Sequence, residues 1–183
     1  MNWPNRLSLI RIGSVPVLTV LLVFSKNVMW LRYVALFLFI LSAITDFVDG
    51  HLARKYNLVT NFGKFIDPVA DKMLVLSALV MLSWLQLTPA WLVVAVMFRE
   101  LAVDGLRMVA VEQGRVIAAG KLGKIKTTVQ LTMIITHLVY FAQFPLLHYL
   151  AYWLLLPTQI AMLIMTVWSG VDYFIRNKEV LHG

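Results

Sequence analysis

The longest uncharged stretch of the chain lies in its second half. Residues 127–171 contain no Asp, Glu, Lys or Arg. That length is about twice the roughly 20 apolar residues that one membrane-spanning helix requires. Gln143, Pro145 and His148 interrupt the stretch near its middle, and such residues favour a turn. The pattern therefore predicts two helices joined by a short connection.

A second uncharged stretch covers residues 73–98 and is broken at Thr88-Pro89. This dipeptide predicts a threonine N-cap followed by proline at the first helical position, so two helices share this stretch as well. Residues 12–25 and 33–45 are shorter. Each reaches spanning length only if charged residues at one end are included.

These patterns predict an all-α integral membrane protein with one domain, residues 1–183. A short interfacial helix around residues 4–9 precedes the first span. No cleavable signal peptide is indicated at the amino terminus, which lacks a basic region followed by an apolar run. The six expected membrane-spanning helices cover about residues 7–25, 30–54, 60–86, 89–112, 122–143 and 149–175.

Charge supports this topology. With both termini on one side, only Lys26 and Arg32 of the 16 Lys and Arg fall on the opposite side, and all nine Asp and Glu share the first side. The positive-inside rule makes that side cytoplasmic. The chain is 61% hydrophobic, with a mean hydropathy of +0.82. The net charge of +7 is therefore attributed to contact with anionic lipid headgroups, and not to nucleic acid.

Acidic residues form a polar stripe on each of two neighbouring predicted helices. Asp46, Asp49 and Ala53 are spaced i, i+3 and i+7, and Gly63, Asp67 and Asp71 are spaced i, i+4 and i+8, so each set shares one helical face. At about 1.5 Å per residue, the four aspartates lie about 24 to 30 Å from the outer helix ends. Two antiparallel helices would thus bring four carboxylates to a similar depth.

Four neighbouring carboxylates in a membrane protein need compensation, because an ionised Asp at a bilayer centre costs roughly 2.5 to 3.5 kcal/mol. Divalent Mg²⁺ or Mn²⁺ is the economical partner, since hard ions prefer carboxylate oxygens. Two alternatives remain open. One is a proton or cation transport pathway, and the other is pairing with basic residues, namely Arg54, Lys64 and Lys72.

The order of these residues narrows the choice. Residues 46–71 read D-x-x-D-G-x-x-A-R-x8-G-x-x-x-D-x-x-x-D, which resembles, with every position filled, the signature of the CDP-alcohol phosphatidyltransferases. The segments PNRLSLIRI, FGKFIDPVADK, FREL and LGKIKT extend the resemblance to bacterial members over most of the chain. The resemblance implies transfer of a phosphatidyl group from CDP-diacylglycerol to an alcohol, release of CMP, and a homodimer in the bacterial inner membrane.

The resemblance also implies roles for individual residues. Asp71 is the expected general base. Two divalent cations, Mg²⁺ or Mn²⁺, are expected on Asp46, Asp49, Asp67 and Asp71. The CDP-diacylglycerol site is expected to involve Gly50, Ala53, Arg54 and Gly63, although small residues in membrane helices also serve close helix packing.

Basic residues in the fourth and fifth predicted helices indicate which alcohol accepts the phosphatidyl group. Arg99, Arg107 and Lys124 are candidate ligands of an acceptor phosphate, because an anionic group needs several cationic donors. This favours glycerol 3-phosphate, with phosphatidylglycerol, inositol phosphate or serine as the alternative acceptors. The active site would open to the cytoplasmic leaflet, where the lipid substrate can enter from the membrane.

Other charged and polar residues in these predicted helices are given structural interpretations. Glu100 and Asp104 are interpreted as partners of Arg99 and Arg107 along one helix, and Asp172 as the partner of Arg176. Lys121 and Lys126 are expected to anchor the fifth span at lipid headgroups. His137 is expected to be structural.

Overall fold

The computed structural model describes the backbone of residues 3–55, 61–115, 117 and 120–181. Within the helices, the side chains of residues 3–6, 46–55, 61–65, 67 and 68 lie outside the described part. Six α-helices and one short 3-10 helix make up the described structure. They are α1 (Trp3–Phe24), α2 (Met29–Lys55), α3 (Asn61–Trp84), α4 (Ala90–Glu112), α5 (Lys121–Ala142), α6 (Leu147–Arg176) and η1 (Lys178–Leu181).

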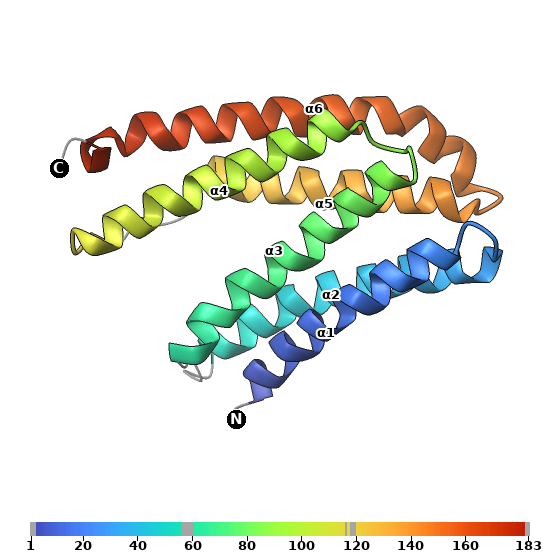
Figure 1. Cartoon of the computed structure of the whole chain (residues 1–183), viewed down its shortest axis with the longest axis horizontal. Helices are drawn as coiled ribbons and strands as arrows, with labels where there is room; N and C mark the ends of the chain where they lie inside the picture. The colour runs from blue at the N-terminus through green and yellow to red at the C-terminus, as the bar shows by residue number, and fades with distance from the viewer. Residues whose placement is uncertain (1–2, 56–60, 116, 118–119, 182–183) are drawn as a thin grey trace.

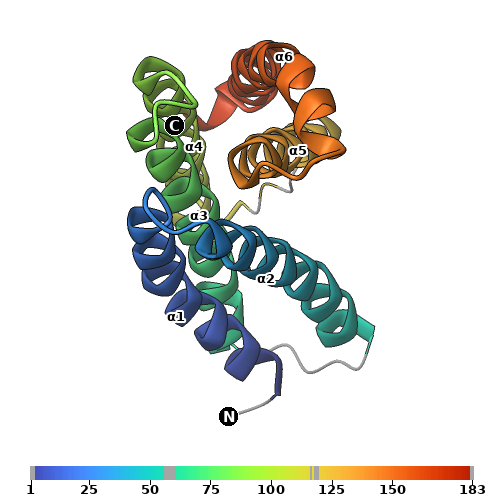
Figure 2. The ribbon, with the colours of Figure 1, turned by 90° about the vertical axis from the view of Figure 1, so that its right-hand side faces the viewer.

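The helices alternate in direction and lie along the long axis of the molecule. In Figure 1 the connections after α1, α3 and α5 lie towards one end, and the end of α2 and the start of α3 lie at the other. α1 packs against α2 and α3, and α5 packs against α6 and α2. Figure 2 shows α5 and α6 side by side on one side of α4. The prediction of six helices with alternating direction is confirmed.

The main core draws buried side chains from all six α-helices. Fully buried apolar side chains from each helix meet there, including Leu22, Phe39, Leu82 and Ile134. These side chains recur at helical spacing, so each helix buries one stripe while its other faces carry exposed apolar residues. An apolar exterior is the expected surface for a helix bundle whose solvent is lipid.

Two local expectations were wrong. α1 runs without interruption from Trp3, so the interfacial helix expected at residues 4–9 is not a separate element. Pro89, and not Thr88, is the N-cap of α4, with φ −67° and ψ 137°. The hydroxyl of Thr88 is buried without a hydrogen-bond partner among the described residues, because the helix begins one residue later than the cap prediction required.

Lys26 and Arg32, the two cations expected on the outer side, have structural partners. The Arg32 guanidinium donates to the carbonyl oxygens of Ser25, Lys26 and Phe141 at 2.9, 3.2 and 3.3 Å. It thereby satisfies carbonyls that the ends of α1 and α5 leave without intrahelical partners. The Lys26 ammonium lies 3.7 Å from the ring centroid of Trp84, in cation–π geometry.

A series of buried hydrogen bonds joins α5, α6 and the connection before α4. His137 is fully buried, and its Nδ1 lies 2.8 Å from the Met133 carbonyl oxygen. Because a carbonyl only accepts, Nδ1 carries the proton and Nε2 accepts from the Gln159 amide at 2.9 Å. The same amide nitrogen donates to the Leu87 carbonyl at 2.9 Å. The structural interpretation of His137 is confirmed.

Length and composition give two described helical segments that could cross a membrane, Leu7–Phe24 and Leu147–Arg176. Met29–Thr45 is apolar but shorter. α4 does not meet the same criterion because Arg99, Glu100 and further charged residues occupy its second half. Four of those charged residues, Arg99, Glu100, Asp104 and Arg107, line the polar cavity described below.

Gln159→Leu is expected to lower stability, because His137 Nε2 and the Leu87 carbonyl lose their shared donor. We expect a loss of about 1 kcal/mol, seen as a melting temperature lower by about 2 to 4 °C in detergent. Thr158→Val is the control, since the Thr158 hydroxyl bonds only carbonyls of its own helix. Equal shifts for the two variants would contradict the bridging role of Gln159.

Candidate active site

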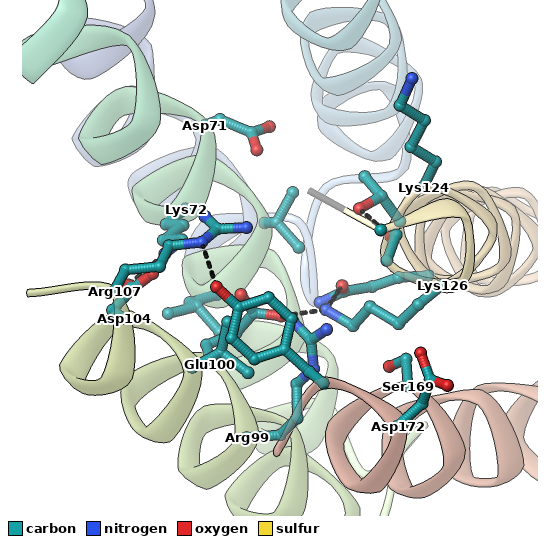
Figure 3. A pocket seen from close by; sticks show the side chains of 18 residues that line it. Asp71, Lys72, Arg99, Glu100, Asp104, Arg107, Lys124, Lys126, Ser169 and Asp172 are labelled. Atoms are coloured by element: carbon teal, nitrogen blue, oxygen red, sulfur yellow. Dashed lines mark hydrogen bonds and ion pairs between the residues drawn. The ribbon is translucent and has the colours of Figure 1, made fainter. Parts of the chain in front are cut away.

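A polar cavity of about 240 Å³ lies between α3, α4, α5 and α6. Figure 3 shows charged side chains entering it from all four helices. On α4, Arg99, Val103 and Arg107 line it at i, i+4 and i+8, and on α6 Ser169 and Tyr173 do so at i and i+4. Helical periodicity therefore directs the polar stripe of each helix into one space. Its five cationic side chains are Lys72, Arg99, Arg107, Lys124 and Lys126.

Glu100 is the central carboxylate of the cavity wall. Its Oε1 accepts from Arg99 Nη1 at 3.1 Å and also from the Lys126 ammonium. Lys126 donates in addition to the Gln130 side-chain oxygen, four residues further along α5. One carboxylate thus links α4 to α5 and holds two cations. Removing one member of such a buried group leaves an uncompensated charge, which typically costs about 3 to 5 kcal/mol.

The prediction that Lys126 anchors α5 at lipid headgroups was wrong, because only 3% of this residue is exposed. One helical turn separates Lys126 from Gln130, so both residues face inward. This i, i+4 polar pair was the signal in the sequence that could have placed Lys126 in the site. Lys121, the first residue of α5, is exposed, as a headgroup anchor must be.

A second ion pair joins α3 to α4. The Lys72 ammonium donates to Asp104 Oδ2, with both side chains about one-third exposed. The expected pairing of Asp104 with Arg107 along α4 was therefore wrong, because a partner on the neighbouring helix is available. The expected pairing of Glu100 with Arg99 is confirmed. Asp172 pairs with Arg176 at 2.7 Å, also as expected.

Arg107 and Lys124 differ from the other cations of the cavity. Among the described residues, neither forms an ion pair with a carboxylate. Arg107 instead donates through Nε to the Tyr173 hydroxyl at 3.1 Å, and Lys124 is exposed at the cavity wall. Both charges remain available to an anion, because no carboxylate neutralises them.

Asp71 enters the same cavity from α3 and lies one residue before Lys72. Its side chain is half-buried. The structure therefore brings together Asp71 and all three expected phosphate ligands, Arg99, Arg107 and Lys124. These residues are spread over more than 50 positions of the chain, from Asp71 to Lys124, and the packing of α3 to α6 brings them to one cavity.

For the remaining predicted site residues the structure describes only the backbone. Asp46, Asp49, Gly50, Ala53 and Arg54 belong to α2, and Gly63 and Asp67 belong to α3. Their side chains lie outside the described residues. Among the side chains that the structure describes, no three of the His, Asp or Glu residues gather closely enough to hold a metal ion.

Two residues of the site were not predicted. Gln130 and Tyr173 each contact a cation of the cavity. Tyr173 lies 66 positions from its partner Arg107, and no sequence spacing connects the two. Among the described residues that line it, the cavity carries five cations against four carboxylates, since Asp71, Glu100, Asp104 and Asp172 also line it. An anionic ligand suits this balance.

Comparison with known proteins identifies the family to which the chain belongs. Residues 1–171 match the family described as CDP-alcohol phosphatidyltransferase. The chain is 40% identical to CDP-diacylglycerol--glycerol-3-phosphate 3-phosphatidyltransferase of Bacillus subtilis, covering 98% of this chain and 97% of that protein. It is also 40% identical to a probable phosphatidylglycerophosphate synthase of Mycobacterium tuberculosis, covering 100% and 84% of the two chains. A match of this extent, together with the apolar helices, means that this chain is a membrane enzyme belonging to the CDP-alcohol phosphatidyltransferase family.

Proposed function

We propose that this enzyme transfers the phosphatidyl group of CDP-diacylglycerol to glycerol 3-phosphate, forming phosphatidylglycerophosphate and CMP. The observation that carries the proposal is the cavity that joins Asp71 to Arg107 and Lys124. A carboxylate able to take a proton and cations able to hold a phosphate lie in one space. The names of the Bacillus subtilis and Mycobacterium tuberculosis relatives describe the same reaction.

The chemistry is a phosphoryl-group displacement. A hydroxyl oxygen of glycerol 3-phosphate attacks the phosphorus that carries diacylglycerol, and the bond from that phosphorus to the bridging diphosphate oxygen breaks. CMP leaves with the bridging oxygen. The proton of the attacking hydroxyl passes to Asp71 as general base, a contribution typically worth about 10² to 10⁴ in rate.

The acceptor phosphate is held by Arg99, Arg107 and Lys124. Arg107 and Lys124, which pair with no carboxylate in the part of the chain that the structure describes, supply positive charge. The guanidinium groups match phosphate geometry through paired N–H donors. Arg99 is paired with Glu100, so it contributes to phosphate binding mainly by orienting the phosphate. Holding the acceptor in this way makes attack effectively unimolecular, which is a large part of enzymatic rate enhancement.

The diphosphate end of the substrate is assigned to α2 and the start of α3. Asp46, Asp49, Asp67 and Asp71 would hold two divalent cations, Mg²⁺ or Mn²⁺, since a set of carboxylate oxygens is the donor set that such ions prefer. When bound, they neutralise charge on the diphosphate. Gly50, Ala53 and Gly63 leave space for the nucleotide, and Arg54 donates to the diphosphate.

The protein is proposed to be one domain that crosses the bacterial inner membrane six times, as a homodimer. The alternating direction of α1 to α6 in Figure 1 supports the six spans. The concentration of Lys and Arg near one set of helix ends supports an active site at the cytoplasmic leaflet. There the diacyl substrate can enter the cavity from the surrounding lipid.

The identity of the acceptor is tested by following CMP release from CDP-diacylglycerol with purified protein in detergent. Glycerol 3-phosphate is expected to support release only when Mg²⁺ or Mn²⁺ is present. Phosphatidylglycerol, inositol phosphate and serine are compared at equal concentration and are expected to support little. Faster release with one of these alternatives would replace the proposed acceptor, and no release with any acceptor would contradict transferase activity.

Asp71→Asn is expected to reduce turnover by at least about 100-fold, because an amide cannot accept the hydroxyl proton. Asp172→Asn is the matched control, since Asp172 lines the same cavity but is paired with Arg176. We expect it to retain activity within a few-fold. Circular dichroism and melting temperature establish that both variants are folded. Full activity of folded Asp71→Asn would exclude Asp71 as the base.

Arg107→Ala and Lys124→Ala are each expected to raise the KM for glycerol 3-phosphate by about tenfold or more, the effect of losing one charge-assisted hydrogen bond. The KM for CDP-diacylglycerol should change much less. Lys121→Ala, an exposed change at the start of α5, is the control. It removes one positive charge without changing a residue that lines the cavity. If both KM values rise equally, these cations do not act at the acceptor phosphate.

A further inference from the structure

Tyr173 presents a hydroxyl to the cavity from a rigid position. Only 7% of the residue is exposed, and it belongs to a buried cluster that includes Val103, Leu106 and Ala110 of α4. Tyr173 also lines the polar cavity. Because the side chain packs in one cluster with residues of α4 and with Val180 of η1, its hydroxyl oxygen is a fixed point at the cavity wall.

The contact with Arg107 uses this fixed point. Arg107 Nε donates to the Tyr173 hydroxyl oxygen at 3.1 Å, and the guanidinium carbon lies 5.6 Å from the ring centroid. A guanidinium is planar, so a bond at Nε restricts the orientation of the whole group. The two terminal nitrogens, which carry four N–H donors, make no hydrogen bond within the described residues. Figure 3 shows Arg107 at the cavity wall, with this bond drawn as a dashed line.

A phenol differs from a carboxylate in what it does to the charge of its partner. Glu100 holds Arg99 and Lys126 by offsetting part of their positive charge. Tyr173 is neutral and orients Arg107 without cancelling its charge. The Tyr173 oxygen accepts from Nε, so its own O–H is still able to donate. An anion at this point would receive the terminal N–H groups of Arg107 and the hydroxyl proton together.

We infer that Tyr173 is a positioning residue for the acceptor phosphate, holding Arg107 in a fixed orientation and adding its own hydroxyl donor to the same phosphate. The inference deepens the proposed function and rests on it for the identity of the acceptor. It assigns part of the selection for phosphorylated acceptors to a neutral side chain on α6. Unphosphorylated alcohols offer no anionic oxygen to these donors and gain less from the arrangement.

The test is Tyr173→Phe in the full-length enzyme, which removes the hydroxyl and keeps the ring. With CDP-diacylglycerol and a divalent cation, the KM for glycerol 3-phosphate is expected to rise about five- to tenfold, the effect of one hydrogen bond to a charged group. The kcat and the KM for CDP-diacylglycerol should stay within about twofold. In an Arg107→Ala background, the same change should raise the KM for glycerol 3-phosphate by less than it does in the wild-type background, because only the direct hydroxyl donor is then lost and coupled residues are non-additive.

Tyr149→Phe is the matched control. It makes the same chemical change on α6 at a residue that is 70% exposed and far along the helix from the cavity, so all kinetic constants should be unchanged. An unchanged KM for glycerol 3-phosphate in Tyr173→Phe would overturn the inference. So would a fall in kcat and melting temperature that affects both substrates equally, since that would indicate a structural role.

Binding of glycerol 3-phosphate, measured by calorimetry without the lipid substrate, separates this inference from the proposed function. If the wild type binds glycerol 3-phosphate but releases no CMP, the proposed function fails. Weaker binding by Tyr173→Phe would then still support the phosphate site, and equal binding would overturn it. If the wild type does not bind glycerol 3-phosphate, both are overturned.

Discussion

Glu100 resolves the main electrostatic problem of this structure, which is how to keep cations inside an apolar helix bundle. Arg99 and Lys126 are both largely buried, and both donate to Glu100 Oε1. Without that carboxylate, two cations would lie in low-dielectric surroundings with no compensating charge. The bridge also fixes α4 against α5, so the cavity wall and its charge balance depend on one residue.

This constraint divides the cations of the cavity into two groups. Lys72, Arg99 and Lys126 are engaged by carboxylates that join neighbouring helices, and they make the wall rigid. Arg107 and Lys124 have no such partner among the described residues. Their charges are the ones that a phosphate can use without competing against a carboxylate. A transferase needs both groups, because a phosphate site is useful only if its donors are already in position.

Polar residues at the other end of the bundle serve packing. Arg32 satisfies carbonyls at the ends of α1 and α5, and His137 and Gln159 form a closed chain of hydrogen bonds. These groups are bound to main-chain carbonyls and to one another, and none of them lines the Asp71 cavity. The polar residues suited to chemistry are therefore concentrated near the opposite end of the bundle.

The sequence by itself determined the helices, the family signature and the residue types of the site. Uncharged stretches and their interruptions placed all six helices within a few residues, because burial in lipid requires long apolar helices. The spacing of residues 46–71 indicated the family. The cations Arg99, Arg107 and Lys124 indicated a phosphate-bearing acceptor, before any knowledge of what they contact.

Only the tertiary structure decided which charges pair across helices. Asp104 pairs with Lys72 on α3 and not with Arg107 on its own helix, and Lys126 turns inward to Glu100. Tyr173 meets Arg107 although nothing in their sequence positions connects them. Local spacing specifies which face a side chain occupies, but the partner on the opposite helix depends on the rotation and depth at which the helices pack. Those quantities arise from the fit of the whole core.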